Sequence, residues 1–332
     1  MERRLFLLIS VAVAIAIPFD TEAQRAERHR LVGVVSSGYS AYWAKGGSLA
    51  HVRSAFEDGL QDAGYAVGPD VAIDFRFAEG DPAKLSVLTA DLMTRSADVL
   101  VVAGPAALRV AQGRLPAYRS WRTISKVTLS RRGSRRAWAR PGGNVTGAFL
   151  DQAEISSKWL ELVREGVPGL ARITAIRDAA TPADQWRALQ LSASVLRIQV
   201  QMIEVRGLPD FEGAFAAAAR NGAQAVVLLS SPLISRHGRA LADLATAKKL
   251  PTISLFKENA TEGCLMSYGP SLVEIWRITG RIAGRVLKGS RASEIPIERP
   301  TRFELVINLK TAKALGLTIP PSLLLRADQV LE

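Results

Sequence analysis

The sequence predicts an α/β protein built from two Rossmann-like lobes with parallel sheets. The 332 residues are 48% apolar and 22% charged, a composition typical of a globular protein with a large core. Single cores stop growing near about 250–300 residues, so a chain of this length favours two domains. Buried strands alternate with amphipathic helices, and this alternation starts again after an interruption in mid-chain.

In the first half, the apolar run RLVGVV ends in small polar residues, which is typical of a buried parallel strand and the loop at its carboxyl end. The next segment places Val52, Phe56 and Leu60 on one helical face and ends at Gly64, a helix-stopping residue. The following elements are a strand in DVAIDFRFAEG, a helix in KLSVLTADLMTR and a strand in ADVLVVAGPAAL. These segments predict the first doubly wound lobe.

In the second half, the helix ISSKWLELVREGVPG directs Ile155, Trp159, Leu162 and Val163 inward. The following elements are a strand in ARITAIRD, a helix in ADQWRALQLSASVLRI, a strand in VQMIEV, a helix in FEGAFAAAARNG and a strand in AQAVVLLSSPL. The repeated order of strand and helix predicts a second lobe of the same kind.

Doubly wound sheets hold ligands outside the carboxyl ends of their strands. The loops at those ends are SSGYS (36–40), AGPAAL (103–108) and SSPLIS (230–235), which offer hydroxyls and small residues. The alternative is that these residues only cap helices. No nucleophile elbow, Walker loop or dinucleotide fingerprint occurs, and His29, His51 and His237 lack metal-ligand spacing. We therefore expect binding without catalysis, cofactor or metal.

Residues 1–23 have the layout of a signal peptide. Arg3 and Arg4 precede an apolar run, and cleavage would follow Ala23, with Thr21 at the minus-three position. The alternative is an uncleaved membrane anchor, although the apolar run is short for a span. The only cysteine, Cys264, excludes an internal disulfide. These features favour export to a bacterial periplasm.

The charge of the chain is concentrated in one block. The net charge is +12, and the segment from Arg114 to Arg140 holds nine Lys/Arg and no Asp/Glu. A nucleic-acid surface would place such charges on a helix or sheet face beside stacking aromatic rings, a setting that Trp121 and Trp138 lack. We therefore expect no nucleic-acid partner.

Three further motifs resemble a known family: RPGGNVTG (140–147), LMSYGPSL (265–272) and RPTRFELVINLKTAKALGLTIPPSLLLRADQVLE (299–332). They are similar to the substrate-binding proteins of ABC transporters in the tryptophan/aromatic-amino-acid-type group. Supporting matches in FEDGLQDAGY, RFAEGD and WLELVREGVPGLARI extend the resemblance over nearly the whole mature chain.

The resemblance implies the type I periplasmic-binding fold, in which two lobes joined by a hinge close on a small molecule. An amino acid is one candidate, and the protein would pass it to an ABC permease in the inner membrane. It implies a first lobe of residues 30–147 plus about 270–295 and a second lobe of 148–269 plus about 296–332. We expect a periplasmic monomer. The ligand contacts implied by the matched motifs are Ser36, Ser37, Tyr42, Gly104, Pro105, Ser230, Ser231, Phe256 and Tyr268.

Among these residues, Ser37, Pro105 and Ser231 lie at strand ends, where backbone N–H groups could hold a carboxylate. The aromatic residues Tyr42, Phe256 and Tyr268 could stack on an apolar or aromatic ligand, and ordinary packing between the lobes is the alternative for them.

The basic block departs from the family. The family has an apolar strand there, then a loop containing DPV, whereas this chain keeps the spacing to Arg140 with different residue types, SWRTISKV replacing the strand. Permitted GC-rich codons for residues 119–137, read one nucleotide earlier, encode a string containing DPV. We hypothesise a pair of compensating frameshifts within Arg114–Ala139, and a functional basic loop is the alternative.

Three other classes remain as alternatives: a ligand-sensing receptor or regulator module, an enzyme, and a frameshift-damaged copy without function. We do not expect a sensor, which would carry a helix-turn-helix before Arg30 or a signalling segment after Glu332. An enzyme would use Glu79 and Asp81, which are better explained as capping a turn and the following helix.

Overall fold

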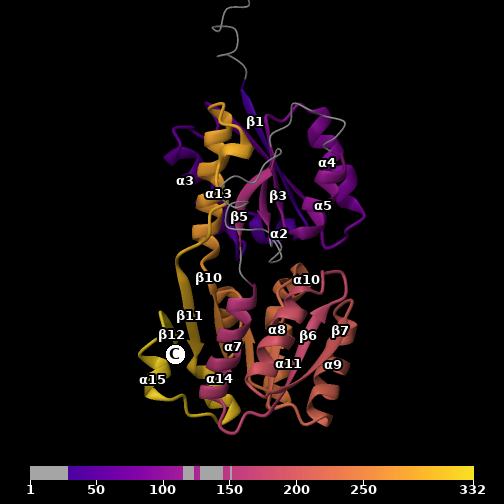
Figure 1. The fold of residues 1–332 in the computed structure, drawn as a ribbon, viewed down its shortest axis with the longest axis vertical. Helices are drawn as coiled ribbons and strands as arrows, with labels where there is room; N and C mark the ends of the chain where they lie inside the picture. The colour runs from indigo at the N-terminus through magenta and orange to yellow at the C-terminus, as the bar shows by residue number, and fades with distance from the viewer. Residues whose placement is uncertain (1–28, 115–122, 128–144, 150–151) are drawn as a thin grey trace, which may run out of the picture.

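The computed structural model describes residues 29–114, 123–127, 145–149 and 152–332, which form two lobes (Figure 1). Each lobe is a mainly parallel β-sheet with helices on either side. In the first lobe, Val34 belongs to the apolar cluster under one face of the sheet and Val35 to the cluster under the other. The predicted fold class, two α/β lobes, is confirmed.

The first sheet has the strand order β2-β1-β3-β4-β5, and all its pairings are parallel. Its strands are β1 (Arg30–Ser36), β2 (Val71–Phe77), β3 (Val99–Ala103), β4 (Thr123–Val127) and β5 (Val145–Phe149). Ser36 pairs with Phe77 on one side and with Ala103 on the other. The carboxyl ends of these three strands therefore meet at one edge of the sheet.

The second sheet has the order β12-β11-β10-β9-β8-β6-β7. Its strands are β6 (Arg172–Asp178), β7 (Gln199–Val205), β8 (Ala225–Leu228), β9 (Thr252–Ser254), β10 (Met266–Pro270), β11 (Phe303–Asn308) and β12 (Gln329–Leu331). The pairing of β10 with β11 is antiparallel, and the others are parallel. The chain leaves this lobe after β10 and returns to it at β11.

Helices of the first lobe are α2 (Ser40–Trp43), α3 (Ala50–Asp62), α4 (Lys84–Thr94), α5 (Pro105–Arg114) and α13 (Leu272–Leu287). Although α13 follows β10 of the second sheet, it packs along α3 in the first lobe. The two helices approach closely at Gly59 and Gly280, where an added Cβ would lie 2.2 Å from a backbone oxygen of the facing helix. Glycine at both positions permits this separation.

The second lobe carries the remaining helices. They are α7 (Gln152–Gly166), α8 (Asp184–Val195), α9 (Pro209–Arg220), α10 (Pro232–Arg236), α11 (Gly238–Ala247), α12 (Lys257–Thr261), α14 (Leu309–Leu315) and α15 (Pro321–Leu324). A short 3₁₀ helix, η2 (Ala292–Glu294), precedes the last crossing between the lobes. Trp159, Ile155, Leu162 and Val163 are buried, as the periodicity of α7 predicts.

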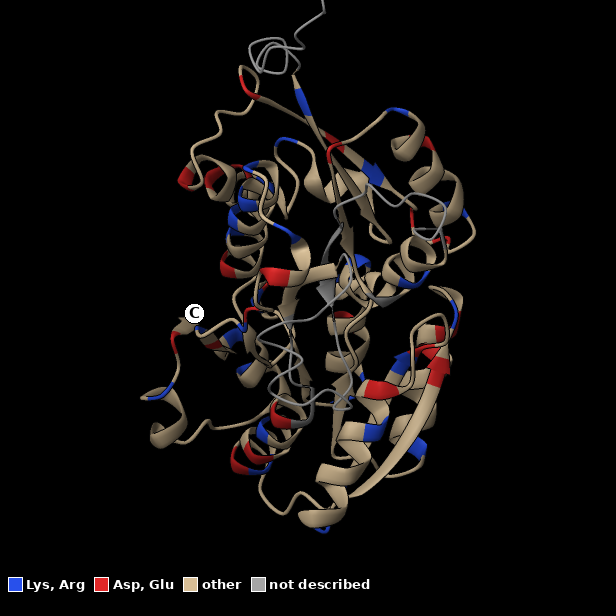
Figure 2. Cartoon of the chain, turned by 45° about the horizontal axis from the view of Figure 1, so that its top comes forward, with Lys and Arg blue, Asp and Glu red and all other residues tan. Residues whose placement is uncertain are grey.

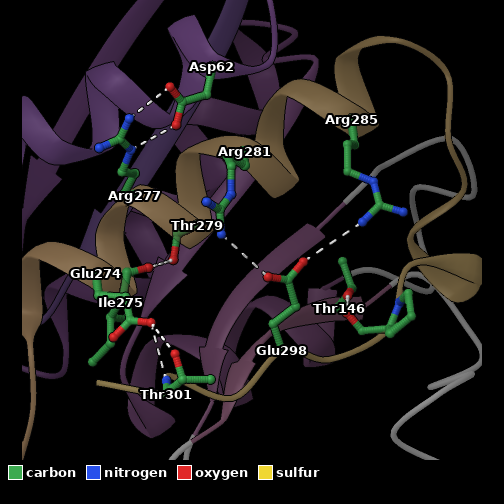
Figure 3. Close-up of polar contacts among 11 residues, drawn as sticks. Asp62, Thr146, Glu274, Ile275, Arg277, Thr279, Arg281, Arg285, Glu298 and Thr301 are labelled. Carbon is green, nitrogen blue, oxygen red and sulfur yellow. Dashed lines mark hydrogen bonds and ion pairs between the residues drawn. The ribbon is translucent and has the colours of Figure 1, made fainter. Parts of the chain in front are cut away.

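Polar contacts fasten the crossover between η2 and β11 to the first lobe (Figure 3). The carboxylate of Glu298 lies 3.7 Å from Arg281 and 3.8 Å from Arg285, both on α13. The carboxylate of Glu274 accepts hydrogen bonds from the backbone N–H groups of Thr301 and Arg302. These contacts hold the crossover against α13 up to the residue that precedes β11.

Charges of both signs are interspersed over the two lobes (Figure 2). The predicted signal peptide and most of the basic block lie outside the described residues. Residues 123–127 of the block form β4, hydrogen-bonded between β3 and β5, because backbone groups can pair in a sheet whatever their side chains. In the described part of the chain, no helix is both long and apolar enough to cross a membrane.

Candidate functional site

A cavity of about 330 Å³ lies between the lobes, at the carboxyl ends of the central strands. The first lobe contributes the loops after β1 and β3 together with α2, α3 and α13, and the second contributes the ends of β6, β8 and β9. This is the position where open α/β sheets bind ligands. The cavity is therefore the candidate site.

Seven of the nine predicted contact residues line this cavity. They are Ser36, Ser37, Tyr42, Gly104, Ser230, Ser231 and Phe256. Pro105 begins α5 directly after Gly104, and its side chain lies outside the described part of the structure. Tyr268 is not in the lining, because its ring stacks on Phe303 of the neighbouring strand, with 5.8 Å between the ring centroids. The fold thus brings seven predicted residues together from both lobes.

Two of the serine hydroxyls also shape their own loops. Ser36 Oγ accepts a hydrogen bond from the Gly38 N–H at 3.0 Å. Ser231 caps α10, and its Oγ accepts from the Ile234 N–H at 3.1 Å. A hydroxyl that accepts in this way still carries its own hydrogen, so each serine can donate to a ligand while it supports the loop.

Gln185 of α8 holds the loop after β8 in place. Its Nε2 donates to the Ser230 carbonyl at 2.8 Å, and its Oε1 accepts from the Ser230 N–H at 2.8 Å. Both backbone groups of Ser230 are thereby paired within the protein. This leaves Ser230 to offer its side chain to the cavity.

Aromatic rings form an apolar wall of the cavity. Trp43 and Trp276 meet edge to face with their centroids 4.6 Å apart, and both line the cavity. Trp43 also packs on Phe75 and Phe77 of β2. Buried aromatic pairs of this kind keep a fixed geometry, so the wall presents a rigid apolar surface.

Acidic residues line the cavity at positions that the sequence analysis did not select. Asp178 is 6% exposed at the end of β6, and its Oδ1 accepts from the Ala180 N–H at 2.9 Å. Glu258 and Glu262 of the second lobe also line it. The strand-end rule could have found Asp178, because it closes the run ARITAIRD as the serines close theirs.

Burial shifts the pKa values of two lining groups. It raises the pKa of Glu262, and the neighbouring Glu258 carboxylate adds to this shift. Burial also raises the pKa of Tyr42, with a further contribution from Glu262. Tyr42 therefore remains a neutral phenol that can donate a hydrogen bond.

The two candidate acids of an enzyme accept backbone hydrogen bonds within the first lobe. Glu79 Oε1 accepts from the Ser40 N–H at 3.0 Å, and Asp81 Oδ1 accepts from the Ala83 N–H at 2.9 Å. Within the described ranges, no group of three or more His, Cys, Asp or Glu could hold a metal. Burial raises the pKa of the Cys264 thiol to about 12. The cavity thus offers hydrogen bonds, a buried carboxylate and aromatic surface.

Solved structures share this two-lobed fold. A conserved domain protein from Vibrio cholerae O1 biovar eltor str. N16961 matches with a TM-score of 0.79 and 22% identity, covering 91% of this chain and 100% of that one. An ABC domain from Streptococcus pneumonia, solved in complex with L-Trp, matches with a TM-score of 0.78 and 22% identity over 92% and 100% of the two chains.

Sequence comparison gives the family. The Tyrosine-binding protein of Clostridioides difficile (strain R20291) is 23% identical over 284 residues, 81% of this chain and 78% of the relative. The model of the family described as ABC transporter substrate binding protein matches residues 42–331, which is most of the chain. The protein therefore belongs to the ABC transporter substrate-binding protein family, as its motifs predict.

Proposed function

We propose that the protein captures an aromatic L-amino acid between its lobes outside the cytoplasm and delivers it to an ABC importer. The observation that carries this proposal is the buried carboxylate of Asp178, which shares one cavity with an aromatic wall. An α-amino acid with an aromatic side chain can pair its ammonium group with the carboxylate and pack its ring on the aromatic wall. The tyrosine named for one relative and the L-Trp bound to another are ligands of this class.

Each part of such a ligand has a counterpart in the cavity. The Asp178 carboxylate suits the ammonium group, since buried charges require a charged or hydrogen-bonded partner. Ser37, Ser231 and the backbone N–H groups that follow Pro105 in the first turn of α5 suit the ligand carboxylate. Trp43 and Trp276 suit the ring, together with Tyr42 and Phe256.

The test is calorimetric titration of purified residues 24–332 with L-tryptophan, tryptamine and indole-3-propionate, after a thermal-shift screen of the natural amino acids. Asp178→Asn keeps an oxygen for the Ala180 N–H and removes the charge. We expect it to weaken L-tryptophan binding at least about thirtyfold, because unpairing a buried charge costs about 2 kcal/mol or more.

Indole-3-propionate lacks the ammonium group, so Asp178→Asn should leave its weak binding unchanged. The control is Asp184→Asn, which removes a carboxylate on α8 that pairs with Arg187 at the surface. Equal loss for all three ligands would refute the assigned role of Asp178. Failure of every amino acid to raise the melting temperature of the wild-type protein would refute the ligand class.

Two further parts of the proposal concern the gene and the transporter. We infer that the block Arg114–Ala139 arose from compensating frameshifts, because it keeps the family's spacing to Arg140 while its residue types differ from those of the family. Resequencing the gene tests this, and a genomic read without an overlapping frame that encodes DPV would contradict it. Delivery is tested by ligand-dependent stimulation of the cognate permease ATPase in proteoliposomes.

A further inference from the structure

The two lobes touch each other directly beside the cavity. In Figure 1, α2 of the first lobe faces α10 of the second. The Tyr42 hydroxyl donates to the backbone oxygen of Arg236 at 2.7 Å. The guanidinium carbon of Arg236 lies 4.2 Å from the centroid of the Tyr39 ring, a cation–π geometry. We call these three residues the interlobe contact.

The first lobe holds both tyrosines ready for this contact. The Tyr39 hydroxyl occupies the space beside Gly80, where an added Cβ would lie 2.2 Å from it. The Ser40 N–H that follows Tyr39 is held by Glu79. Tyr39 and Tyr42 meet edge to face, with 6.3 Å between their centroids. Because the rings are positioned within one lobe, little conformational entropy is lost when Arg236 reaches them.

A second pair joins the lobes nearby. His51 Nε2 of α3 lies 3.2 Å from Glu258 Oε1 of α12. The His51 side chain is 43% exposed, whereas that of Glu258 is 16% exposed. An ion pair with one exposed partner contributes little to stability. Arg236 is exposed as well, and the interlobe contact adds a hydrogen bond and a cation–π contact to this pair.

We propose that Tyr39, Tyr42 and Arg236 stabilise the closed arrangement of the lobes and thereby set ligand affinity. An interaction made only in the closed state shifts the equilibrium toward that state, and a ligand that binds the closed state then binds more tightly. The statement about affinity rests on the proposed function, whereas the statement about closure does not. One cation–π contact with one hydrogen bond should change the ratio of closed to open molecules about fivefold to thirtyfold.

The test measures the distance between the lobes by double electron–electron resonance, in the absence of any ligand. Spin labels are attached at Gln112→Cys in the first lobe and Gln190→Cys in the second, both exposed, while the native Cys264 is buried and stays unlabelled. The variants are Arg236→Gln and Tyr39→Leu. The matched control is Arg239→Gln, an exposed arginine of α11 that pairs with Asp243 of the same helix.

We expect a closed component in the ligand-free wild type, and a fivefold to thirtyfold lower ratio of closed to open molecules in both variants, with no change in the control. An unchanged ratio in Arg236→Gln would overturn the proposal, as would a wild type that is entirely open. Arg236→Gln leaves the first lobe unchanged. If Tyr39→Leu does not fold, the ratio of closed to open molecules in Arg236→Gln therefore tests the proposal by itself. If no amino acid binds the wild type, the proposed function fails while the distances still test closure.

Discussion

Replacing either of two helical glycines with alanine should change the free energy of unfolding, and the two changes should have opposite signs. At Gly280 of α13, the added Cβ would lie 2.2 Å from the Phe56 oxygen and 2.9 Å from the Gly59 Cα. These are backbone atoms, so α3 and α13 must separate, and overpacking of this kind costs about 1–3 kcal/mol. Alanine regains about 0.5–1 kcal/mol of helix stability. We expect a net loss of roughly 1–2 kcal/mol for Gly280→Ala.

Gly213 of α9 is the matched control, because nothing lies within 4 Å of its added Cβ. Gly213→Ala should therefore raise the free energy of unfolding by about 0.5–1 kcal/mol. Urea unfolding followed by circular dichroism measures both changes. Since Trp276 is on α13 and lines the cavity, Gly280→Ala should also weaken ligand binding. A stability of Gly280→Ala equal to that of Gly213→Ala would refute the close approach of the helices.

Two other predictions concern the cavity walls. Gln185→Met unpairs both backbone groups of Ser230 and should lower the free energy of unfolding by about 1–3 kcal/mol. Gln190→Met on the same helix is the control and should leave the free energy of unfolding almost unchanged. Equal effects of the two substitutions in urea unfolding would contradict this prediction. Burial raises the pKa of Glu262 above its ordinary value of 4.5, so its contribution to stability is full below that pH and is lost as the pH rises through the raised value. Glu262→Gln should flatten this fall in melting curves from pH 4 to 8, unlike the exposed Glu212→Gln, and an unchanged slope would argue against the burial effect.

The elements of the fold follow from local patterns. The run RLVGVV became β1, buried on both faces, and the inward residues of α7 are those that its period of 3.6 predicts. The strand-end loops were also predictable, since parallel strands end at one edge of their sheet. Most of the expected contact residues therefore lie at the cavity, because those that line it, except Tyr42 of α2, lie at the end of a strand or within three residues after it.

The sequence by itself determined the fold class, the family and the loops from which a site could be built, because hydrophobic period and motif are properties of neighbouring residues. Only the tertiary structure decided that Trp276 of α13 returns to the first lobe and meets Trp43, and that Arg236 reaches Tyr39. Tyr268 shows the same dependence, because its ring turns to Phe303 and leaves the lining. Periodicity encodes which face of an element is buried, whereas a cavity between lobes depends on how distant segments dock.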